Sequence, residues 1–535
     1  MRFAFHSNDP STPREAFNSK LFLVIVVSTC GSIIFGYDLA FIGGVFSLPS
    51  FIARFDLANQ NASALQAHMV NVFQAGAFFG VMVVYFVNER FGRRFALLWA
   101  SIIFNVGVVL SMASMGNIPV FLVGRIVSGL GVGATTFAVP QYLSECAPAS
   151  ARGGIVGCFE IGTQIGTITG FWINYGVQQT VDPVGDKQWF IPIAFQFIPA
   201  GLMAIGLFFL SESPRWLFSK HRDADAVEAL TWLRQLPVEH PYVAEELEDY
   251  RRQMGHEAAL APEETFWAIL KETFSPRVLP RLVHGCLLMI LQNSTGINAM
   301  NNFSVSFFAS LGFQGTSVKL LSTGIYGIVK GIAATITFLF LIDRFGRRPL
   351  LFVGSVMCAF AMYYVAAFSA ITDSFHSSQD PSSATYSAVA FIYIFGAGYS
   401  IGWNIPWIVA SEIFPTRIRS FCLVFTTCSH WLGEFYTSYA VTYMFASITY
   451  GTFIFFGSMT VIGGVYVYLF LPETKGVSLE QMDTLFAQKG FAKQKMRLFK
   501  EIHMDAAVIE GQEGNLTDDN LAKKEDAMFQ SAVNY

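Results

Sequence analysis

The sequence predicts an all-α membrane protein with twelve transmembrane helices, arranged in two six-helix halves that a polar linker joins. Three observations support this prediction: the composition, the number of long apolar runs and a repeat of charged motifs. Of the 535 residues, 53% are hydrophobic and only 13% are charged. Soluble proteins carry about 25% charged residues, so we expect much of this chain's surface to face lipid.

Twelve apolar runs are long enough to cross the hydrocarbon core of a bilayer, which takes about 20 residues of helix. The runs are 21–48, 66–88, 95–115, 118–142, 154–177, 190–210, 282–308, 319–342, 349–372, 386–411, 420–444 and 451–471. The chain then divides into a tail (1–20), a first bundle (21–210), a linker with short helices near 222–235 and 239–256 (211–281), a second bundle (282–471) and a second tail (472–535). The first run is too long for a signal-peptide core, so we expect a retained span.

Basic residues in the short loops predict the orientation of the spans. The loops after spans 2, 4, 8 and 10 hold Arg90, Arg93, Arg94, Arg152, Arg344, Arg347, Arg348, Arg417 and Arg419, whereas the opposite loops hold only Arg54, Lys187 and Lys319. We therefore expect both termini and the linker to be cytoplasmic. The sequon that begins at Asn61 falls in an outside loop and is a candidate glycosylation site.

Several classes of function find no support in the sequence. The net charge of −4 gives no case for nucleic-acid binding. The seven cysteines lie within or beside apolar runs without metal-ligand spacing, and we interpret them as small core residues. We find no Ser/His/Asp set, metal cluster or phosphate loop, so we predict no enzyme activity, no cofactor and no metal site. We expect a monomer.

Charged motifs recur in the same order at the ends of corresponding spans in the two halves. The stretch 89–94 (Glu-Arg-Phe-Gly-Arg-Arg) has a counterpart at 343–348 (Asp-Arg-Phe-Gly-Arg-Arg), and 144–152 (Ser-Glu-x-x-Pro-x-x-x-Arg) has one at 411–419. Glu212 and Glu473 follow spans 6 and 12. Three pairs in register predict a parallel repeat, an architecture of transporters that rock two halves around a midplane site.

The repeated charges also suggest a latch at the cytoplasmic mouth. Arginines and glutamates there can pair when the mouth closes and must separate when it opens. An exposed pair contributes only about 0–1 kcal/mol, so such a set would not trap one state. The alternative is a topology signal only, and we expect both roles together. The predicted gate residues are Arg90, Arg94, Glu145, Arg152, Glu212, Arg344, Arg348, Glu412, Arg419 and Glu473.

Further motifs make the chain resemble the sugar porter family of the major facilitator superfamily. They are Gly36-Tyr37-Asp38, Gly124-Arg125, Pro140-x-Tyr142-x-Ser144-Glu145, Glu212-Ser213-Pro214-Arg215, Gly296-Ile297-Asn298-Ala299, Pro406-Trp407 and Pro472-Glu473-Thr474-Lys475-Gly476. Within the family the chain is most similar to the fungal quinate permease group, through the stretches 74–80, 170–176 and 232–237. The resemblance implies the major facilitator fold and transport of a small polar solute by alternating access.

Asp38 in span 1 and Arg125 in span 4 are charged residues inside spans, where a charge is costly and indicates function. An aspartate beside an arginine stays ionised, whereas one that is moved away and desolvated can take up a proton. In the resembled family, residues at these two positions form the proton-coupling pair of symporters. The alternative is a fixed structural pair that only holds spans 1 and 4 together.

Amide side chains in spans 5 and 7 match the family's substrate-binding positions. They are Gln164, Gln292, Asn293 and Asn298. An amide both donates and accepts hydrogen bonds, which suits a hydroxylated solute. Asn298 lies six residues and nearly two helical turns beyond Gln292, so these amides could contact different depths of one ligand. The alternative is hydrogen bonding between helices, which is common for amides in membranes.

Span 10 adds Trp407, which can stack on the apolar face of a ring while its N–H donates a hydrogen bond. The adjacent Pro406, together with Gly402, can break or bend that helix.

Three ionisable side chains depart from the common family pattern, and we include them in the predicted substrate site. Lys330 in span 8 could pair with a carboxylate of the substrate or, alternatively, with Glu434. Glu434 would repel an anion unless it is protonated or paired. His430 and Glu434 lie one turn apart on one face of span 11 and could form a second proton site. Glu160, one turn before Gln164, is expected to give structural or gating support.

These observations predict a multi-pass carrier in the plasma membrane that takes up a monosaccharide, a polyol or a quinate-like hydroxylated compound, with proton symport. The alternatives are a facilitative sugar carrier and a nutrient sensor that binds without transport. Such sensors carry long cytoplasmic tails with repeats, and the tail of this chain, 472–535, shows none. The expected partners are the solute, protons and the lipid bilayer.

Overall fold

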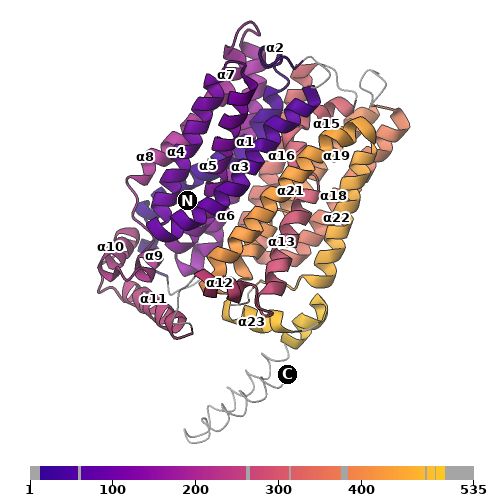
Figure 1. Ribbon diagram of the computed structural model, residues 1–535. Helices are drawn as coiled ribbons and strands as arrows, with labels where there is room; N and C mark the ends of the chain where they lie inside the picture. The colour runs from indigo at the N-terminus through magenta and orange to yellow at the C-terminus, as the bar shows by residue number, and fades with distance from the viewer. Residues whose placement is uncertain are drawn as a thin grey trace, which may run out of the picture.

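The structure is a computed structural model that describes residues 12–57, 62–260, 266–311, 315–374, 383–475, 477, 479–488 and 490–499. The predicted glycosylation site Asn61 and the predicted tail beyond 499 lie outside the described residues. Figure 1 shows two helical bundles side by side, with the first half of the chain in indigo to magenta and the second half in pink to yellow.

The first bundle holds six spans, the last of which consists of two consecutive helices. Its helices are α1 (Ser19–Val45), α2 (Pro49–Arg54), α3 (Ala62–Phe91), α4 (Arg93–Ala113), α5 (Ile118–Cys146), α6 (Arg152–Thr180), α7 (Lys187–Phe195) and α8 (Phe197–Leu207). Asn18 begins α1, because its side-chain oxygen accepts from the backbone N–H groups of Lys20 at 2.9 Å and Leu21 at 3.0 Å. Inside the bundle α5 packs against α3 and α4, and α1 packs against α6.

The second bundle also holds six spans, of which three are irregular. Its helices are α13 (Leu279–Ser294), α14 (Ile297–Asn302), α15 (Ser304–Ser310), α16 (Thr316–Ile336), α17 (Ile342–Phe345), α18 (Arg347–Thr372), α19 (Ser383–Gly402), α20 (Pro406–Glu412), α21 (Arg419–Ser447) and α22 (Gly451–Phe470). A π-helical segment, η3 (Thr337–Leu341), joins α16 to α17 within one span. The twelve-helix architecture predicted from the sequence is confirmed.

Spans 7 and 10 are broken near their middles. Span 7 was expected as one helix over 282–308, but it divides at Gly296, whose φ of +89° lies in the left-handed region that glycine tolerates. A side chain there would also meet the Phe456 ring at 2.6 Å. Span 10 divides between Gly402 and Pro406, where the sequence predicted a break. Both breaks free backbone groups inside the protein, where they can act as hydrogen-bond partners.

The two halves meet mainly along three pairs of helices. Across this boundary α3 packs against α21, α6 packs against α16 and α1 packs against α14. Each pair joins one element of the first bundle to one of the second, and these are the surfaces that must slide or separate if the halves rock. The midplane site predicted by the repeat would then lie between α1, α3 and α6 on one side and α14, α16 and α21 on the other.

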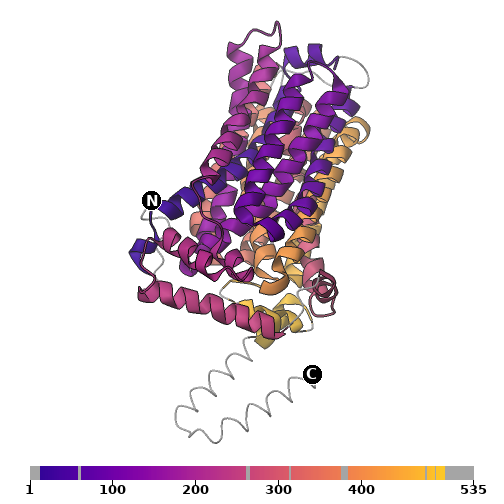
Figure 2. The same ribbon diagram turned by 60° about the vertical axis from the view of Figure 1, so that its left-hand side comes forward.

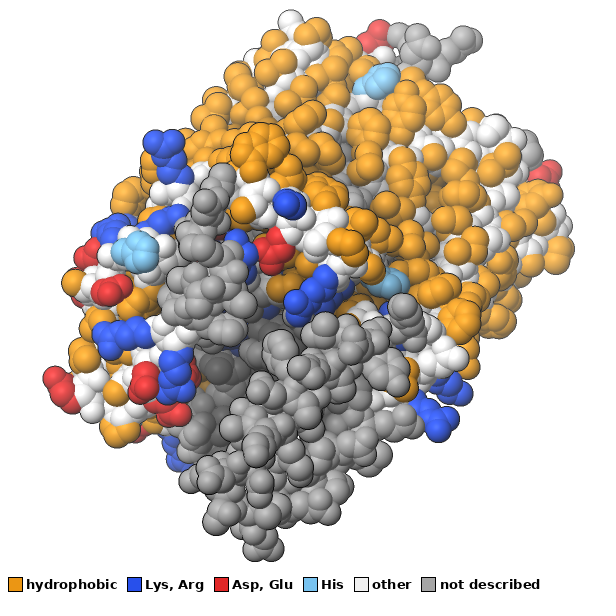
Figure 3. Space-filling view, turned by 60° about the horizontal axis from the view of Figure 1, so that its bottom comes forward, with side chains coloured by type: hydrophobic (Ala, Val, Ile, Leu, Met, Phe, Trp, Pro, Cys, Tyr) orange, Lys and Arg blue, Asp and Glu red, His pale blue; other side chains and the backbone are white. Residues whose placement is uncertain are grey.

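The linker forms four helices at one end of the molecule, which we call the linker end. They are α9 (Pro214–Ser219), α10 (Asp223–Arg234), α11 (Pro241–Leu260) and α12 (Phe266–Thr273), and the tail helix α23 (Leu479–Ala487) lies at the same end. The turned view agrees (Figure 2). Viewed from this end, blue and red side chains gather there while the flanks are largely hydrophobic (Figure 3). The predicted linker helices near 222–235 and 239–256 correspond to α10 and α11, whereas the sequence analysis missed α9 and α12.

Arg234 fastens the linker to the first bundle. Its side chain is fully buried and donates to the carbonyl oxygen of Cys146 at 3.0 Å and to both carboxylate oxygens of Glu246 at 2.6 and 2.9 Å. The carboxylate of Glu246 raises the pKa of the Arg234 guanidinium, so this contact stays charged. On the other side, Glu272 of α12 accepts a hydrogen bond from Arg417 of the second bundle. The linker therefore contacts both halves.

The repeated motifs build the same structure at the linker end of each half. Glu212 accepts from the backbone N–H groups of Arg93 at 2.9 Å and Arg94 at 3.1 Å, which begin α4. Glu473 accepts from the N–H groups of Arg347 at 2.9 Å and Arg348 at 3.0 Å, which begin α18. A carboxylate at the start of a helix satisfies N–H groups that have no partner within the helix and favourably meets the positive end of the helix dipole.

A glycine precedes each of these capped helices, and its backbone geometry excludes other residues. Gly92 has a φ of +102° and Gly346 a φ of +89°. A β-carbon at Gly92 would lie 2.4 Å from a carboxylate oxygen of Glu212, and one at Gly346 would lie 2.7 Å from Glu473.

We predict that Gly92→Ala lowers the thermal stability of the purified protein, because the new methyl group must displace the Glu212 carboxylate and occupy a left-handed conformation. Strain of this kind costs about 1–3 kcal/mol. Gly201→Ala in α8 is the matched control, since a β-carbon there meets nothing within 4 Å. Equal melting temperatures for the two variants would contradict the proposed role of Gly92.

Candidate functional site

Three of the twelve spans are less apolar than the others, and they carry most of the predicted site. Among the described residues, nine stretches are long and apolar enough to cross a membrane by length and composition. The predicted spans 154–177, 282–308 and 420–444, which contain α6, α13 to α15 and α21, are not among them. Each of these spans lies at the boundary between the halves or contacts a helix that does, so their polar side chains face one another inside the protein.

Asp38 of α1 and Arg125 of α5 form a buried ion pair, as the sequence predicted. One guanidinium nitrogen of Arg125 lies 2.8 and 3.1 Å from the two carboxylate oxygens of Asp38, and both side chains are at most 3% exposed. A second guanidinium nitrogen donates to the carbonyl oxygen of Met69 at 3.2 Å, and the Phe73 ring lies 4.2 Å from the guanidinium carbon. The charge of Asp38 is thus balanced by a group on another helix of the same half.

The amides of span 7 form one connected network with His430. Asn298 donates to the side-chain oxygen of Asn293 at 2.6 Å, because the break at Gly296 brings α14 back toward the end of α13. The sequence analysis assumed one continuous helix and did not foresee this contact; the expectation that the amides of span 7 contact different depths of one ligand stays a prediction. Gln292 donates to the carbonyl oxygen of Trp403 at 2.6 Å, at the break of span 10. Asn293 and Gln292 both lie 3.1 Å from Nδ1 of His430.

Glu434 joins the two halves of the protein. Its oxygen Oε1 accepts from Gln74 of α3 at 3.1 Å and from Asn302 of α14 at 3.4 Å. The same two amides also donate to Ser438, one turn further along α21, at 3.1 and 3.2 Å. The predicted site residues did not include Gln74, Asn302 or Ser438.

Lys330 of α16 does not pair directly with Glu434. Its ammonium group donates to the side-chain oxygen of Asn301 at 3.4 Å and lies within electrostatic range of both Glu160 and Glu434. The side chain is 3% exposed, and the Tyr399 ring lies 5.9 Å from the ammonium nitrogen. One buried lysine thus stands between two carboxyl groups on different helices. Glu160, which we expected only to support Gln164, belongs to this charged group.

Trp407 and Gln164 border the same region. The Trp407 ring lies 4.7 Å from the His430 ring and 6.1 Å from that of Phe159, measured between ring centres. Gln164 is buried, and no hydrogen-bond partner for its side-chain oxygen is found in the part of the chain that the structure describes.

Several buried polar atoms near these residues also lack partners among the described residues. They are the ring nitrogen of Trp403, the side-chain nitrogen of Asn404, Nε2 of His430 and Oε2 of Glu434. Buried polar groups are usually hydrogen-bonded, so a group of unpartnered donors and acceptors favours a polar ligand. We call Gln164, Gln292, Asn293, Asn298, Lys330, Trp403, Asn404, Trp407, His430 and Glu434 the central polar cluster.

At the linker end, each half contains a buried or half-buried ion pair of its own. Arg93 binds Glu145 at 3.0 Å and Arg347 binds Glu412 at 2.8 Å. The sequence analysis selected Arg90, Arg94, Arg344 and Arg348 instead.

Arg90 and Arg344 lie over the rings of Phe91 and Phe345, each at 5.6 Å, and Arg94 and Arg348 donate to the backbone carbonyls of Leu207 and Tyr468, each at 2.7 Å. Arg152 lies within electrostatic range of Tyr250, and Arg419 donates to the carbonyl of Phe414 at 3.4 Å. A hydrogen bond from Gln141 to Ser420 at 2.9 Å does cross the boundary between the halves at this end. The latch itself stays a prediction.

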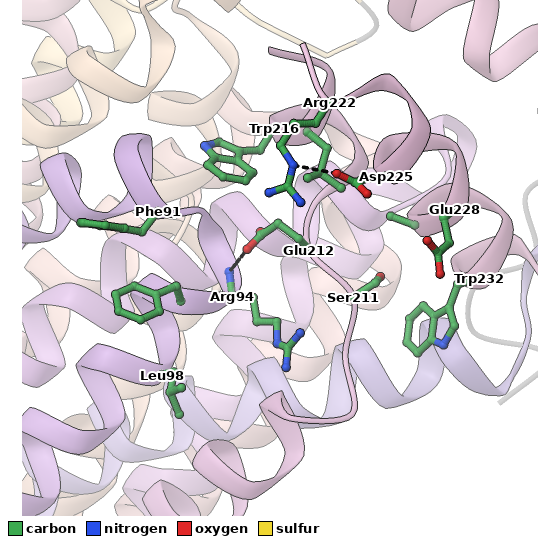
Figure 4. Close-up of a pocket in the computed structure, with 13 residues that line it drawn as sticks. Phe91, Arg94, Leu98, Ser211, Glu212, Trp216, Arg222, Asp225, Glu228 and Trp232 are labelled. Atoms are coloured by element: carbon green, nitrogen blue, oxygen red, sulfur yellow. Dashed lines mark hydrogen bonds and ion pairs between the residues drawn. The ribbon is translucent and has the colours of Figure 1, made fainter. Parts of the chain in front are cut away.

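A cavity of about 460 Å³ lies apart from the central polar cluster, between the start of α4 and the linker helices α9 and α10 (Figure 4). Four of its charged groups contact one another, since Glu212 contacts Arg94 and Arg222 binds Asp225 at 2.7 Å. Burial raises the pKa of the Glu212 carboxyl, although its hydrogen bonds to backbone N–H groups act in the opposite direction.

The fold and the central polar cluster define a polytopic membrane transporter built from two six-helix halves. Residues 23–486 match the family described as "Sugar (and other) transporter", and the chain belongs to this family. The family is one of transporters and not of enzymes. The resemblance predicted from the sequence motifs is thereby confirmed.

Curated relatives and solved structures agree with this assignment. The chain is 38% identical to a probable quinate permease of Aspergillus niger over 528 residues, which cover 97% of this chain and 98% of the relative. It is 39% identical to the quinate permease of Emericella nidulans over 503 residues, which cover 92% and 93%. The structure of the proton:xylose symporter XylE bound to 6-bromo-6-deoxy-D-glucose superposes with a TM-score of 0.73 at 25% identity and covers 88% of this chain and 99% of that chain. The inward open conformation of XylE from E. coli gives 0.68 at 25% identity and covers 87% and 99%.

We predict that Arg125→Met strongly destabilises the protein, because it leaves the Asp38 carboxylate buried without its partner. Breaking a buried pair in this way costs about 3–5 kcal/mol. The double variant Asp38→Asn/Arg125→Met removes both charges and should melt at a higher temperature than Arg125→Met alone. Arg54→Met, which removes an ion pair to Asp186 that is 41% and 39% exposed, should change the melting temperature little. Additive losses in the double variant would contradict a pairwise interaction between Asp38 and Arg125.

Proposed function

We propose that the protein takes up a hydroxylated cyclic solute together with protons, by alternating access across the plasma membrane. The observation that carries the proposal is the buried Asp38–Arg125 pair in a half whose helices α1, α3 and α6 face the central polar cluster. A proton-coupled carrier needs a carboxylate that is ionised in one conformation and protonated in another. Asp38 can meet this need if rocking of the halves moves it away from Arg125.

A hydroxylated carboxylate of the quinate type is our first candidate for the solute. The curated relatives named above are called quinate permeases. The amides of Gln292, Asn293 and Asn298 can exchange hydrogen bonds with several hydroxyl groups, and Trp407 can stack on the apolar face of a ring. Lys330 supplies a buried positive charge for the carboxylate, since its only hydrogen bond within the described chain, to Asn301, is a long one.

A neutral monosaccharide is the second candidate. XylE, which superposes well on this chain, is named a proton:xylose symporter and was solved with a bromo-deoxy-glucose. For such a solute the charge of Lys330 would be balanced by Glu160 and Glu434, which lie within its electrostatic range. The two candidates therefore differ in what Lys330 faces, and this difference can be tested.

The orientation of the protein follows from the same proposal. The linker end, which carries the repeated charges, is the cytoplasmic side, and both termini are cytoplasmic. The residues Arg90, Arg94, Glu145, Arg152, Glu212, Arg344, Arg348, Glu412, Arg419 and Glu473 then surround the inner mouth. The pairs Arg93–Glu145 and Arg347–Glu412 would hold the inner end of each half together while the mouth opens and closes. Asn61 would be glycosylated on the outside, and the carrier would act as a monomer.

The proposal is tested by uptake in a yeast strain that lacks its own carriers. Labelled quinate, xylose, glucose and inositol are offered to cells that express the protein, at several external pH values and with a protonophore. We expect accumulation of at least one of these solutes that rises as the external pH falls and collapses with the protonophore. Uptake that is indifferent to both treatments would establish facilitated diffusion instead, and binding without uptake would indicate a sensor.

We predict that Asp38→Asn abolishes accumulation while exchange of labelled for unlabelled solute continues. The amide keeps the shape of the side chain and a hydrogen bond to Arg125, but it cannot take up and release a proton. The variant therefore still moves the solute across the membrane but no longer couples this movement to protons. Accumulation and exchange are measured in the same vesicles. Full accumulation by this variant would show that Asp38 is not the coupling group.

We predict that Lys330→Met reduces the affinity for quinate by about tenfold or more relative to its affinity for xylose, which corresponds to about 1.4 kcal/mol. Methionine keeps the length and apolar stem of lysine but removes its charge. Competition of each solute against the other reports the ratio of affinities. An unchanged ratio would favour the neutral monosaccharide as the natural solute.

A further inference from the structure

His430 and Glu434 face each other across one helical turn of α21, but no hydrogen bond joins their side chains. Nε2 of His430 lies 3.8 Å from Oε2 of Glu434, and both side chains are at most 3% exposed. Neither atom has a hydrogen-bond partner among the described residues. The ring nitrogen Nε2 and the carboxylate oxygen Oε2 thus point toward each other. The other polar atoms of the two side chains, Nδ1 of His430 and Oε1 of Glu434, have hydrogen-bond partners.

The surrounding hydrogen bonds determine which nitrogen of His430 carries the proton. Gln292 donates through its NH₂ group to the Trp403 carbonyl, so its side-chain oxygen is an acceptor and faces Nδ1 of His430 at 3.1 Å. The second neighbour of Nδ1, the amide nitrogen of Asn293, can only donate, and it already donates to the carbonyl oxygens of Met289 and His430. Nδ1 therefore carries a hydrogen, which it donates to Gln292.

A neutral imidazole with its hydrogen on Nδ1 presents a bare lone pair at Nε2. Facing it, an ionised Glu434 presents a second acceptor. Two buried acceptors repel each other and leave both without a partner, which is unfavourable inside a protein. One additional proton, either on the carboxyl oxygen or on Nε2, converts the contact into a hydrogen bond or an ion pair. A solute hydroxyl cannot replace it fully, because its single hydrogen can be donated to only one of the two acceptors.

The other charged and titratable groups around Glu434 come from neighbouring helices. Asp38 of α1 and Lys330 of α16 act on Glu434 electrostatically, and Tyr399 of α19 lies within electrostatic range of it. Lys330 also faces Glu160, so it does not neutralise Glu434 alone, and Asp38 is itself a carboxylate, whose charge Arg125 balances. From α3 and α14 the neighbours are the neutral amides of Gln74 and Asn302.

The position of this junction connects it to the movement of the halves. The hydrogen bond from Gln74 to Glu434 crosses from the first bundle to the second, along the contact between α3 and α21. Separation of these helices removes a donor from Glu434 and opens the junction to water. A proton at this place is therefore exposed or enclosed by the same movement that exposes or encloses the solute.

We propose that His430 and Glu434 together hold one exchangeable proton, which is transported with the solute in addition to the proton on Asp38. This inference rests on the proposed proton symport. It gives the carrier two protons per solute, and for an anionic solute the second proton offsets the charge that Glu434 brings into the central polar cluster.

The test measures how many protons move with each solute molecule in liposomes that contain the purified full-length protein. With the membrane potential held at zero, the steady accumulation of labelled quinate is measured at several pH differences, or that of xylose if only xylose is taken up by yeast. The slope of the logarithm of the accumulation ratio against the pH difference equals the number of coupled protons. We expect a slope near two for the unmodified protein.

Glu434→Gln should lower this slope by one while transport continues. Glutamine keeps the shape of the side chain and the oxygen that accepts from Gln74 and Asn302, and its NH₂ group can donate to Nε2 of His430, so it imitates the protonated state permanently. His430→Gln should lower the slope by the same amount, and the double variant should lower it no further, because the two residues share one proton. Ser438→Ala is the matched control: it removes the other acceptor of Gln74 and Asn302 but no titratable group, and the slope should not change.

The outcomes separate the two proposals. A slope of zero for the unmodified protein overturns the symport proposal itself, and the second proton with it. A slope that is above zero and identical in the unmodified protein and in Glu434→Gln leaves the symport intact and overturns the role of His430 and Glu434. If Glu434→Gln does not fold, His430→Gln alone decides between these results, since an unchanged slope there is equally decisive.

Discussion

The hydrogen bond from Gln292 to the carbonyl oxygen of Trp403 is the contact on which the interior of this protein depends. Backbone groups inside a bilayer must find partners within the protein, so helices break there only where other groups replace the lost hydrogen bonds. The breaks of spans 7 and 10 lie beside each other, and a side chain from one satisfies the backbone of the other. This arrangement fixes Gln292, and Gln292 in turn fixes the orientation of the His430 ring.

The same constraint explains how the polar side chains of the interior are arranged. The less apolar spans, α6, α13 to α15 and α21, turn polar side chains such as Gln164, Gln292 and Glu434 inward, where they are at most 3% exposed. Among the buried groups Asp38 and Arg125 satisfy each other, whereas groups on α16 and α21 lack partners in the part of the chain that the structure describes. The first half thus carries a closed ion pair, whereas unpartnered polar atoms occur among the described residues of both halves, on Gln164 of α6 as well as on His430 and Glu434 of α21. The two proposed proton sites, Asp38 and the His430–Glu434 pair, lie in different halves, and one movement of the halves can act on both.

The sequence predicted the architecture and most of the candidate site, because the length of the apolar runs, the charges of the loops and the repeated motifs can all be read along the chain without knowledge of its folding. Residue type and spacing were enough to predict Asp38 with Arg125, the amides of span 7 and the break at Pro406. The contact between Asn298 and Asn293 was not foreseen, since the left-handed turn at Gly296 changes which residues meet. Arg93 and Arg347 were overlooked in favour of their neighbours. In a run of adjacent arginines, only the direction of each side chain shows which one reaches a glutamate.

The two capped helices at the linker end have a mechanical consequence. Glu212 follows the sixth span of its half and holds the start of the third, and Glu473 does the same in the second half. Each bundle is therefore closed into a ring at this end, from its last helix back to an early one. A ring of this kind resists splaying, so deformation concentrates at the seam between the rings. If one such bundle were duplicated, the two copies would already be able to move relative to each other, because a boundary arises wherever two closed bundles lie side by side.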